Sequence, residues 1–329
     1  MAYDRGVEER PAIQIQSWRA GRLQTSTDVG VLAGLVGARD SRTWIDLTDA
    51  PPELVQATAA ALGLHPLVAE DIIESNERAK VQLVGDVIHV VAFMLERIDE
   101  VETHEIDFVL GHGFLLSAHR LAWDPTTAHQ MRVGVGALLE RGPDYVLWAL
   151  VDALVDGYFP VFDRLGDEID EVQDSAVERP VPATLERLFK LKRELIRIRH
   201  VLGPSREVFA QLTSREFGLI AEANVFYFRD VYDHLIRLND ELDSFRELAA
   251  GSLEIYLSTI NNNLSTIMKR LTGVTVVLAG IGAIAGLFGM SEAATAIAGL
   301  EGSGFYAVLL TTVVGSAGAV WVLRRIDWL

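Results

Sequence analysis

The side chains that could do chemistry in this sequence are mainly carboxylates and imidazoles. The 46 Asp and Glu residues outnumber the 29 Lys and Arg residues, there are eight histidines, and there is no cysteine. The lack of thiols excludes disulfide scaffolds, thiolate metal sites and cysteine nucleophiles. The excess of carboxylates disfavours nucleic acid as a partner, because phosphates require Lys and Arg, and it is compatible with attraction of cations.

The histidines form no recognisable zinc or catalytic motif. His112 lies in the sequence GHG, His119 follows it, and no HExxH motif occurs. We expect no histidine to pair with a carboxylate one helical turn away, and we expect His112 and His119 at a hairpin tip or on the surface. A Gly-rich phosphate loop, a nucleophile elbow and paired catalytic carboxylates are also missing from the sequence, so we expect no enzymatic activity.

A series of small residues could line or pack a membrane helix. Thr275, Ala279, Gly282 and Gly286 recur at spacings of four, three and four, which places them on one face of a helix. A stripe of this kind has two interpretations, namely close packing against another helix or the lining of a narrow pore.

The same face continues towards the N-terminus through Leu271, Met268 and Ser265. A ring of Leu271 and Met268 at the inner mouth of a pore could act as a gate by dewetting. The alternative for this part of the face is an ordinary coiled-coil seam.

The small residues belong to the first of two uncharged runs near the C-terminus. Residues 271–291 and 302–323 each lack charge over roughly 20 residues, the length needed to cross a hydrocarbon layer. The flanking charges are Lys269 and Arg270 before the first run, Glu292 and Glu301 between the runs, and Arg324 and Arg325 after the second. Positive residues favour the cytoplasmic side, so both termini are expected to face inward. Two helices cannot enclose an aqueous path, so conduction would require oligomerisation.

The first third of the chain is expected to mix strands with helices. Strands are predicted over residues 12–18 and 42–47 from alternating or clustered apolar residues, and a helix over 51–64 that Gly63 ends. Two hairpins are predicted, one turning at Gly85 and Asp86 and the other at residues 111–113.

After about Asp124 the apolar residues recur every three or four positions, which predicts long amphipathic helices. We expect Pro180, Pro182 and Pro204 to interrupt these helices. No proline follows Pro204, so one helix could run from about Ala221 through Gly289, on the order of 100 Å at 1.5 Å per residue.

Residues 226–272, beginning FYFRDVYDHLIRLNDELDSF, are followed by an apolar span, GM at its exit, a second span and the terminal RRIDWL. Together these features resemble the CorA family of divalent-cation channels, and the resemblance spans nearly the whole chain, most strongly from about Tyr145 onward. LVDALVDGYF, LKRELIRIRHVLGPSREVF and HPLVAEDI also resemble family segments. Members typically carry GMN after the first span, whereas this chain has GMS.

The resemblance implies an α+β homopentamer shaped as a funnel, with an N-terminal α/β/α cytoplasmic domain, a long stalk helix and a C-terminal two-helix transmembrane hairpin in the inner cell membrane. It implies passive influx of Mg²⁺, or of Co²⁺ or Ni²⁺, driven by membrane potential and gated by the internal cation. The related ZntB branch moves Zn²⁺, which stays open as an alternative. A pentameric scaffold or cation sensor that does not conduct is the third possibility, because Ser291 is shorter than asparagine and lacks its carbonyl oxygen.

Site residues follow from the same resemblance. The pore-lining series is Ser265, Met268, Leu271, Thr275, Ala279, Gly282 and Gly286; the selectivity mouth is Gly289, Met290, Ser291 and Glu292; the basic ring is Arg324 and Arg325. Asp230 matches an acidic residue that binds regulatory divalent ions between protomers, with its counterpart from the neighbouring protomer near Asp99.

The expected organisation follows these assignments along the chain. The segments are residues 1–145 for the cytoplasmic domain, 146–270 for long helices and stalk, 271–290 for the pore helix, 291–303 for the external loop, 304–324 for the second span and 325–329 for the basic tail.

Overall fold

The structure is a computed structural model that describes residues 11–36, 41–74, 76, 78–214, 217–289, 303–326 and 328. The chain divides into two compact units. The first comprises Met1–Val172 and Glu186–Ala250, and the second comprises Gln173–Leu185 and Gly251–Leu329.

The first unit is built on a seven-stranded sheet in the order β2-β1-β3-β7-β6-β5-β4. The strands are β1 Ile13–Arg19, β2 Arg22–Ser26, β3 Arg42–Thr48, β4 Lys80–Val84, β5 Val87–Arg97, β6 Val101–Gly111 and β7 Phe114–His119. Among the described strands, β3 and β7 form the one parallel pair, while every other neighbouring pair is antiparallel.

The predicted strands and hairpins are confirmed. In β1 the burial alternates along the strand, as expected for a strand with one face on the core. Gly85 turns β4 into β5 with φ of 61°, and Gly113 turns β6 into β7 with φ of 81°, a backbone region that suits glycine. The predicted helix over 51–64 is α2, Pro52–Leu62, and Gly63 ends it in a left-handed conformation.

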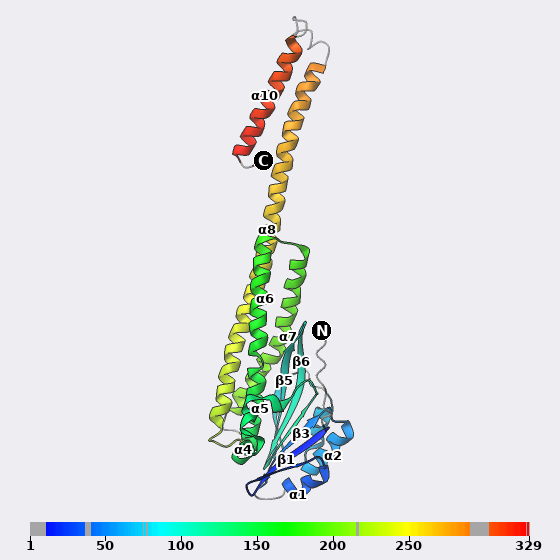
Figure 1. Cartoon of the computed structure of the whole chain (residues 1–329), viewed down its shortest axis with the longest axis vertical. Helices are drawn as coiled ribbons and strands as arrows, with labels where there is room; N and C mark the ends of the chain where they lie inside the picture. The colour runs from blue at the N-terminus through cyan, green and yellow to red at the C-terminus, as the bar shows by residue number, and fades with distance from the viewer. Residues whose placement is uncertain are drawn as a thin grey trace. The chain divides into compact units, whose positions relative to one another are not determined.

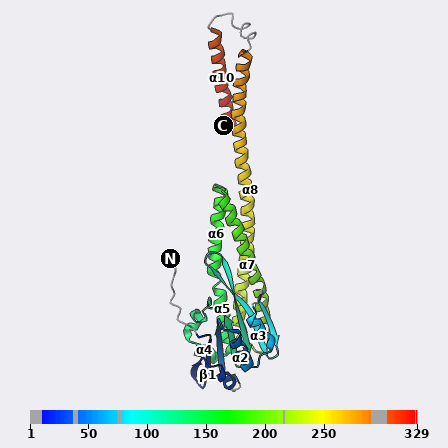
Figure 2. The ribbon, with the colours of Figure 1, turned by 90° about the vertical axis from the view of Figure 1, so that its right-hand side faces the viewer.

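Helices cover both faces of the sheet (Figures 1 and 2). On one face α1 Leu32–Val36, α2 and α3 Pro66–Ile73 bury an apolar cluster that includes Ile45, Val55 and Leu116. The other face packs against α4 Val135–Arg141 and α5 Pro143–Asp156. Short 3-10 turns lie at Val29–Val31, Pro125–Thr127 and His129–Val133. The predicted three-layer α/β/α arrangement is therefore confirmed.

Two long helices follow, α6 Phe159–Glu178 and α7 Pro182–Leu212. Pro182 begins α7, as a proline at the first helical turn can. The expectation that Pro204 interrupts a helix is wrong, because Pro204 lies inside α7. Leu202, Val208 and Phe209 are buried around it, so packing on this face outweighs the one backbone hydrogen bond that proline removes.

The predicted long helix is confirmed as α8, Val225–Gly289, and a further helix, α10, covers Ser303–Arg325 (Figure 1). Among the described residues two stretches are long and apolar enough to cross a membrane. In one, Pro143–Glu178, 67% of the apolar window is buried within the fold, which makes this window a core segment of a folded domain. The other, Val225–Gly286, is only 6% buried over its apolar window, so this part of α8 lacks a cover from its own chain.

Candidate metal centre

Three ligand atoms meet on the first unit. One atom each from Asp152, Asp230 and His234 lie within 4.8 Å of one another, and this is the one such group of three or more among the described residues. Asp152 comes from α5, and Asp230 and His234 come from α8, where they lie one turn apart. The expectation that no histidine pairs with a carboxylate one turn away is therefore wrong, and the sequence FRDVYDH already contained the pair.

The two helices are fixed against each other where both begin. The Asp144 carboxylate, in the first turn of α5, accepts hydrogen bonds from Ala221 N at 2.9 Å and from Asn224 Nδ2 at 2.8 Å. Phe228 and Val231, in the first two turns of α8, are fully buried. These contacts set the rotation of α8 that turns Asp230 and His234 towards α5.

The charges at the site favour binding of a cation. Burial, together with repulsion from Asp156 and Asp230, raises the pKa of Asp152 to about 6. The Gln130 amide donates a hydrogen bond to Asp152, and His234 acts against the shift. A divalent ion between these carboxylates would remove the repulsion that the protein alone leaves in place.

Two buried polar atoms at the site have no hydrogen-bond partner in the described part of the chain. They are Gln130 Oε1, on the amide that touches Asp152, and His234 Nδ1, whose neighbour Asp156 Oδ1 lies 3.9 Å away. An amide oxygen, two carboxylates and an imidazole nitrogen form a donor set that suits a divalent metal. The residues present therefore fit a bound divalent cation.

Asp99 lies in a different part of the first unit. It sits in the turn between β5 and β6, where its backbone carbonyl accepts a hydrogen bond from Lys190 Nζ at 2.6 Å. The same hairpin is fixed to α6 and α7 by Arg97, which pairs with Glu168 and, at 3.0 Å, with Glu194. Within one chain, the cluster around Asp230 is completed by Asp152 and His234.

The seven residues of the expected pore series all lie on α8 in the second unit. They are Ser265, Met268, Leu271, Thr275, Ala279, Gly282 and Gly286, and every one is exposed in the single chain. The Thr275 hydroxyl donates to Leu271 O at 2.8 Å, so part of its polarity is satisfied within the helix.

The expected mouth and basic ring are described only in part. Gly289 is the last residue of α8, whereas Met290, Ser291 and Glu292 lie outside the described residues. Arg324 and Arg325 form the last turn of α10, with the Arg325 guanidinium 5.3 Å from the centre of the Trp321 ring.

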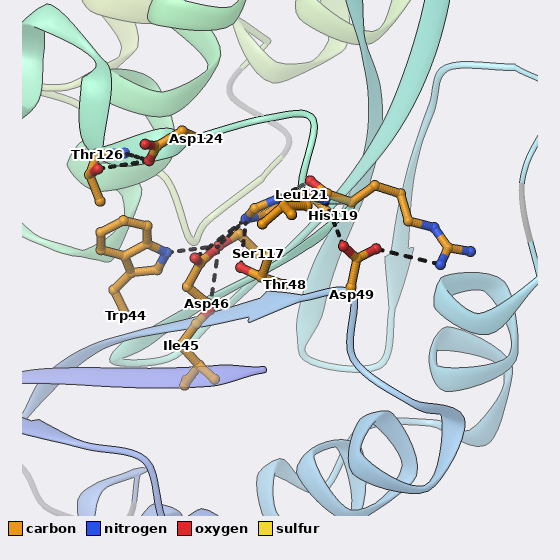
Figure 3. A network of polar contacts seen from close by, with 11 residues as sticks. Trp44, Ile45, Asp46, Thr48, Asp49, Ser117, His119, Leu121, Asp124 and Thr126 are labelled. Atoms are coloured by element: carbon orange, nitrogen blue, oxygen red, sulfur yellow. Dashed lines mark hydrogen bonds and ion pairs between the residues drawn. The ribbon is translucent and has the colours of Figure 1, made fainter. Parts of the chain in front are cut away.

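His119 was expected on the surface, and this expectation is wrong. Its ring lies in a buried polar network between the ends of β3 and β7 (Figure 3). His119 Nδ1 donates to Arg120 O at 2.7 Å, and Nε2 lies 3.2 Å from Asp46 Oδ1. His119 is the last residue of β7, so no alternation of apolar and polar residues continues beyond it to indicate that it is buried. His112, by contrast, is exposed in the hairpin turn, as expected.

The network resembles a hydrolase triad in composition but lacks its connections. Ser117 Oγ donates to Asp46 instead of to His119, and it accepts a hydrogen bond from Trp44 Nε1 at 2.9 Å (Figure 3). Ser117 is also fully buried, so a substrate could not reach it. The network joins two parallel strands in register and has no catalytic geometry.

Comparison with known proteins covers both units. The family described as "CorA-like Mg2+ transporter protein" matches residues 40–325. The chain is 34% identical over 262 residues to the cobalt/magnesium transport protein CorA of Thermotoga maritima, covering 77% of this chain and 74% of that protein. It is 25% identical over 307 residues to the zinc transport protein ZntB of Cronobacter sakazakii, covering 88% and 89%.

Solved structures share the fold. The complete CorA magnesium transporter of Methanocaldococcus jannaschii aligns with a TM-score of 0.77 at 20% identity, covering 96% of this chain and 98% of that one. Full-length CmaX aligns with a TM-score of 0.74 at 19% identity, covering 98% and 100%.

Proposed function

The chain belongs to the CorA-like family of Mg²⁺ transporters, and on this basis we propose that it forms a membrane channel for divalent metal cations, with Mg²⁺ as the main cargo and Co²⁺ or Ni²⁺ as further ones. The observation that carries the proposal is the family match over residues 40–325, which includes α8 and the cluster around Asp230. Family membership also confirms the expectation that the chain is not an enzyme. Influx is passive and driven by the membrane potential.

Conduction requires several copies of the chain, and we take the assembly to be a homopentamer in a lipid bilayer. The exposure of the α8 stripe supports this assembly, because a single chain leaves the stripe uncovered. In the proposed pore the small residues from Thr275 to Gly286 line the axis, and Met268 and Leu271 form an apolar constriction near the inner mouth.

The outer mouth is proposed at residues 289–292. Mg²⁺ gives up water reluctantly, so an entrance suits it when oxygen ligands hold the hydration shell instead of stripping it. Ser291 would supply a ring of hydroxyls, wider and weaker than the amide ring of the GMN signature. Glu292 would add negative charge that attracts cations.

The proposed orientation places both termini in the cytoplasm of a cell whose inner membrane holds the protein. Lys269 and Arg270 on α8, and Arg324 and Arg325 on α10, would then lie at the cytoplasmic face. This orientation puts the acidic first unit on the side where the internal cation concentration can be sensed.

Gating is proposed to depend on the metal centre. A divalent ion bound by Asp152, Asp230 and His234 would cancel the repulsion among these carboxylates, and Asp99 of a neighbouring copy would complete the ligand set. High internal Mg²⁺ would therefore stabilise a symmetric closed ring, and low Mg²⁺ would loosen it.

Transport distinguishes the proposal from its alternatives. The test measures uptake of Mg²⁺ and of Zn²⁺ in a host that lacks its own transporters, with the parent chain and with Ser291→Asn. Mg²⁺ uptake by the parent supports the proposal, and uptake of Zn²⁺ alone would favour a ZntB-type transporter. If only Ser291→Asn conducts, the parent is a scaffold or sensor. Thr295→Asn, a few positions further along, controls for a nonspecific amide effect.

A further inference from the structure

A cavity of about 380 Å³ lies in the first unit, away from the metal centre and on the face of the sheet covered by α2 and α3. Its wall includes Leu47 and Asp49 at the end of β3, and Ala118 and Arg120 at the end of β7. These two strands are the parallel pair. In open sheets with parallel strands, ligands bind beyond the carboxyl ends of those strands.

Two carboxylates of β6 line the cavity. Glu105 and Asp107 lie two positions apart, so their side chains project from the same face of the strand. Asp107 is only 4% exposed, and its Oδ1 accepts a hydrogen bond from His89 Nε2 at 2.7 Å. The hydrogen bond that Asp107 makes within the part of the chain that the structure describes uses Oδ1, which leaves its second oxygen, Oδ2, as an acceptor. A buried carboxylate therefore keeps one acceptor open at the cavity.

The surroundings hold these carboxylates in place and compensate their charge only in part, through His89 and Lys80. Glu105 accepts two hydrogen bonds from Asn76, one from the backbone N and one from Nδ2, both at 2.6 Å. Lys80 pairs directly with Asp71 at 2.7 Å, and its charge acts on Glu105 and Asp107 less strongly than burial does. Burial raises the pKa of Glu105 and that of Asp107, and the negative charge of Asp107 raises the pKa of Glu105 further. An external cation is therefore favoured here.

The walls limit which cation fits. Leu47, Val55, Ile72, Ile73 and Phe93 form an apolar part of the wall that offers a hydrated metal ion no hydrogen-bond partner, whereas polar side chains line the rest of the cavity. Among the described residues, the carboxylates of this cavity also do not form a group of three metal-ligand atoms, unlike the centre on α8. The charged lining consists of three carboxylates and one guanidinium, Arg120, beside the imidazoles of His104 and His119, so it favours a cation over an anion. An organic cation with an apolar body matches both the carboxylates and the apolar part of the wall.

We propose that this cavity binds a small primary alkylammonium ion, with the ammonium group on Asp107 Oδ2 and the Glu105 carboxylate and the alkyl chain against Leu47, Val55 and Ile72. An ammonium group has three N–H donors, and bonds from a charged donor to a carboxylate are stronger than neutral ones. The inference concerns a site separate from the proposed ion pathway and does not depend on transport.

The experiment titrates the full-length protein in detergent with n-butylamine hydrochloride at constant pH, ionic strength and Mg²⁺, and follows the thermal midpoint together with calorimetric binding. We expect a saturable rise in the midpoint with n-butylammonium and none with 1-butanol, which has the same chain without the charge. This ligand comparison uses the unmodified protein. Equal effects of the two compounds, no saturation, or displacement of the amine by Mg²⁺ would each overturn the proposal.

Variants locate the site. Asp107→Asn and Glu105→Gln should each weaken n-butylammonium binding by about tenfold or more, since each removes a charged acceptor. Ala118→Val should weaken binding by narrowing the cavity while leaving its charge unchanged, which covers the case that Asp107→Asn does not fold. Asp86→Asn, an exposed carboxylate in the β4–β5 turn, is the matched control and should bind as the parent does. Loss of binding in this control, or full binding in all three cavity variants, contradicts the assignment.

Discussion

Helix α8 consists of two segments whose side chains have opposite surroundings. In residues 225–250 an apolar face that includes Phe228, Leu235 and Leu238 is fully buried within the first unit. Further along, Leu264, Met268 and Leu271 are 59%, 54% and 58% exposed. The first segment is therefore stabilised by its own chain, whereas the second leaves its apolar surface for lipid or for other copies.

The two segments differ in whether their apolar side chains are covered by the same chain. Unbroken helical periodicity extends over both segments, so the backbone gives no sign of the change. The difference lies in what covers the side chains and in charge, because the first segment carries charged residues on its uncovered face, whereas residues 271–289 carry none. The metal centre lies on the polar face of the first segment, and the proposed pore lies on the stripe of the second.

The largest effect on the free energy of unfolding is expected when a leucine is replaced by alanine in each segment of α8. Leu235→Ala should lower the free energy of unfolding by about 2–5 kcal/mol, because Leu235 is fully buried and a cavity remains. Leu271→Ala should change it by less than about 0.5 kcal/mol, since its side chain is largely exposed in the chain. Urea unfolding followed by tryptophan fluorescence measures both. Equal losses would show that Leu271 is as tightly packed as Leu235, which would break the comparison.

The second effect concerns pH at the polar face of the first segment. The pKa of Asp152 is raised to about 6, so the folded state holds a proton that the unfolded chain releases near pH 4. The contribution of Asp152 to the free energy of unfolding is therefore present at low pH and is lost as the pH rises through about 6. The loss amounts to up to about 3 kcal/mol. Asp152→Asn should lack this part of the dependence.

The measurement is the difference in unfolding free energy between parent and Asp152→Asn across about pH 4 to 8, without divalent ions. Because a metal binds the ionised carboxylate, Mg²⁺ should stabilise the parent more at about pH 7 than at about pH 5. A flat difference between the two proteins, or stabilisation by Mg²⁺ that is independent of pH, would contradict the role of Asp152.

The third effect tests Asp230 directly. At a Mg²⁺ concentration about one hundred times its dissociation constant, binding to the folded state stabilises by about 2.7 kcal/mol. Asp230→Ala should lose most of this gain and most of the Mg²⁺ protection from proteolysis. Asp233→Ala, which removes an exposed carboxylate on the same helix, should keep both. Unchanged protection in Asp230→Ala would remove the metal centre from the gating proposal.

Local patterns in the sequence were sufficient for the sheet hairpins and for α8. Glycine at Gly85 and Gly113 marks the turns, because the backbone there needs a positive φ. The start of α8 at Val225 lies four residues after the expected one, because the Asp144 carboxylate holds Ala221 N outside the helix. Strand β2 at the sheet edge was not predicted, since its exposed residues show no alternation.

Contacts between residues that lie far apart in the chain could not be predicted from the sequence. Asp152 reaches Asp230 only because α5 and the start of α8 pack together, and no spacing rule links the two positions. The Asp230 and His234 pair differs, because its spacing of four residues is local and is visible in the sequence. The predictions for His119 and Pro204 were wrong because burial against other elements, which one sequence does not display, decides both cases.

The smallest effect on stability is expected in the second segment of α8 and separates the two interpretations of its stripe. Thr275→Val keeps the shape of the side chain and removes a hydroxyl that bonds Leu271 O at 2.8 Å within the helix. The free energy of unfolding should change by less than about 0.5 kcal/mol, because Thr275 is exposed in the chain and the Leu271 carbonyl keeps its backbone hydrogen-bond partner. If the stripe lines the pore, the apolar replacement should raise the barrier to a hydrated cation and reduce Mg²⁺ flux. If the stripe only packs helices, Thr275→Val should leave Mg²⁺ flux as in the parent. Val276→Thr, on the neighbouring face, should then have the same effect on flux as Thr275→Val.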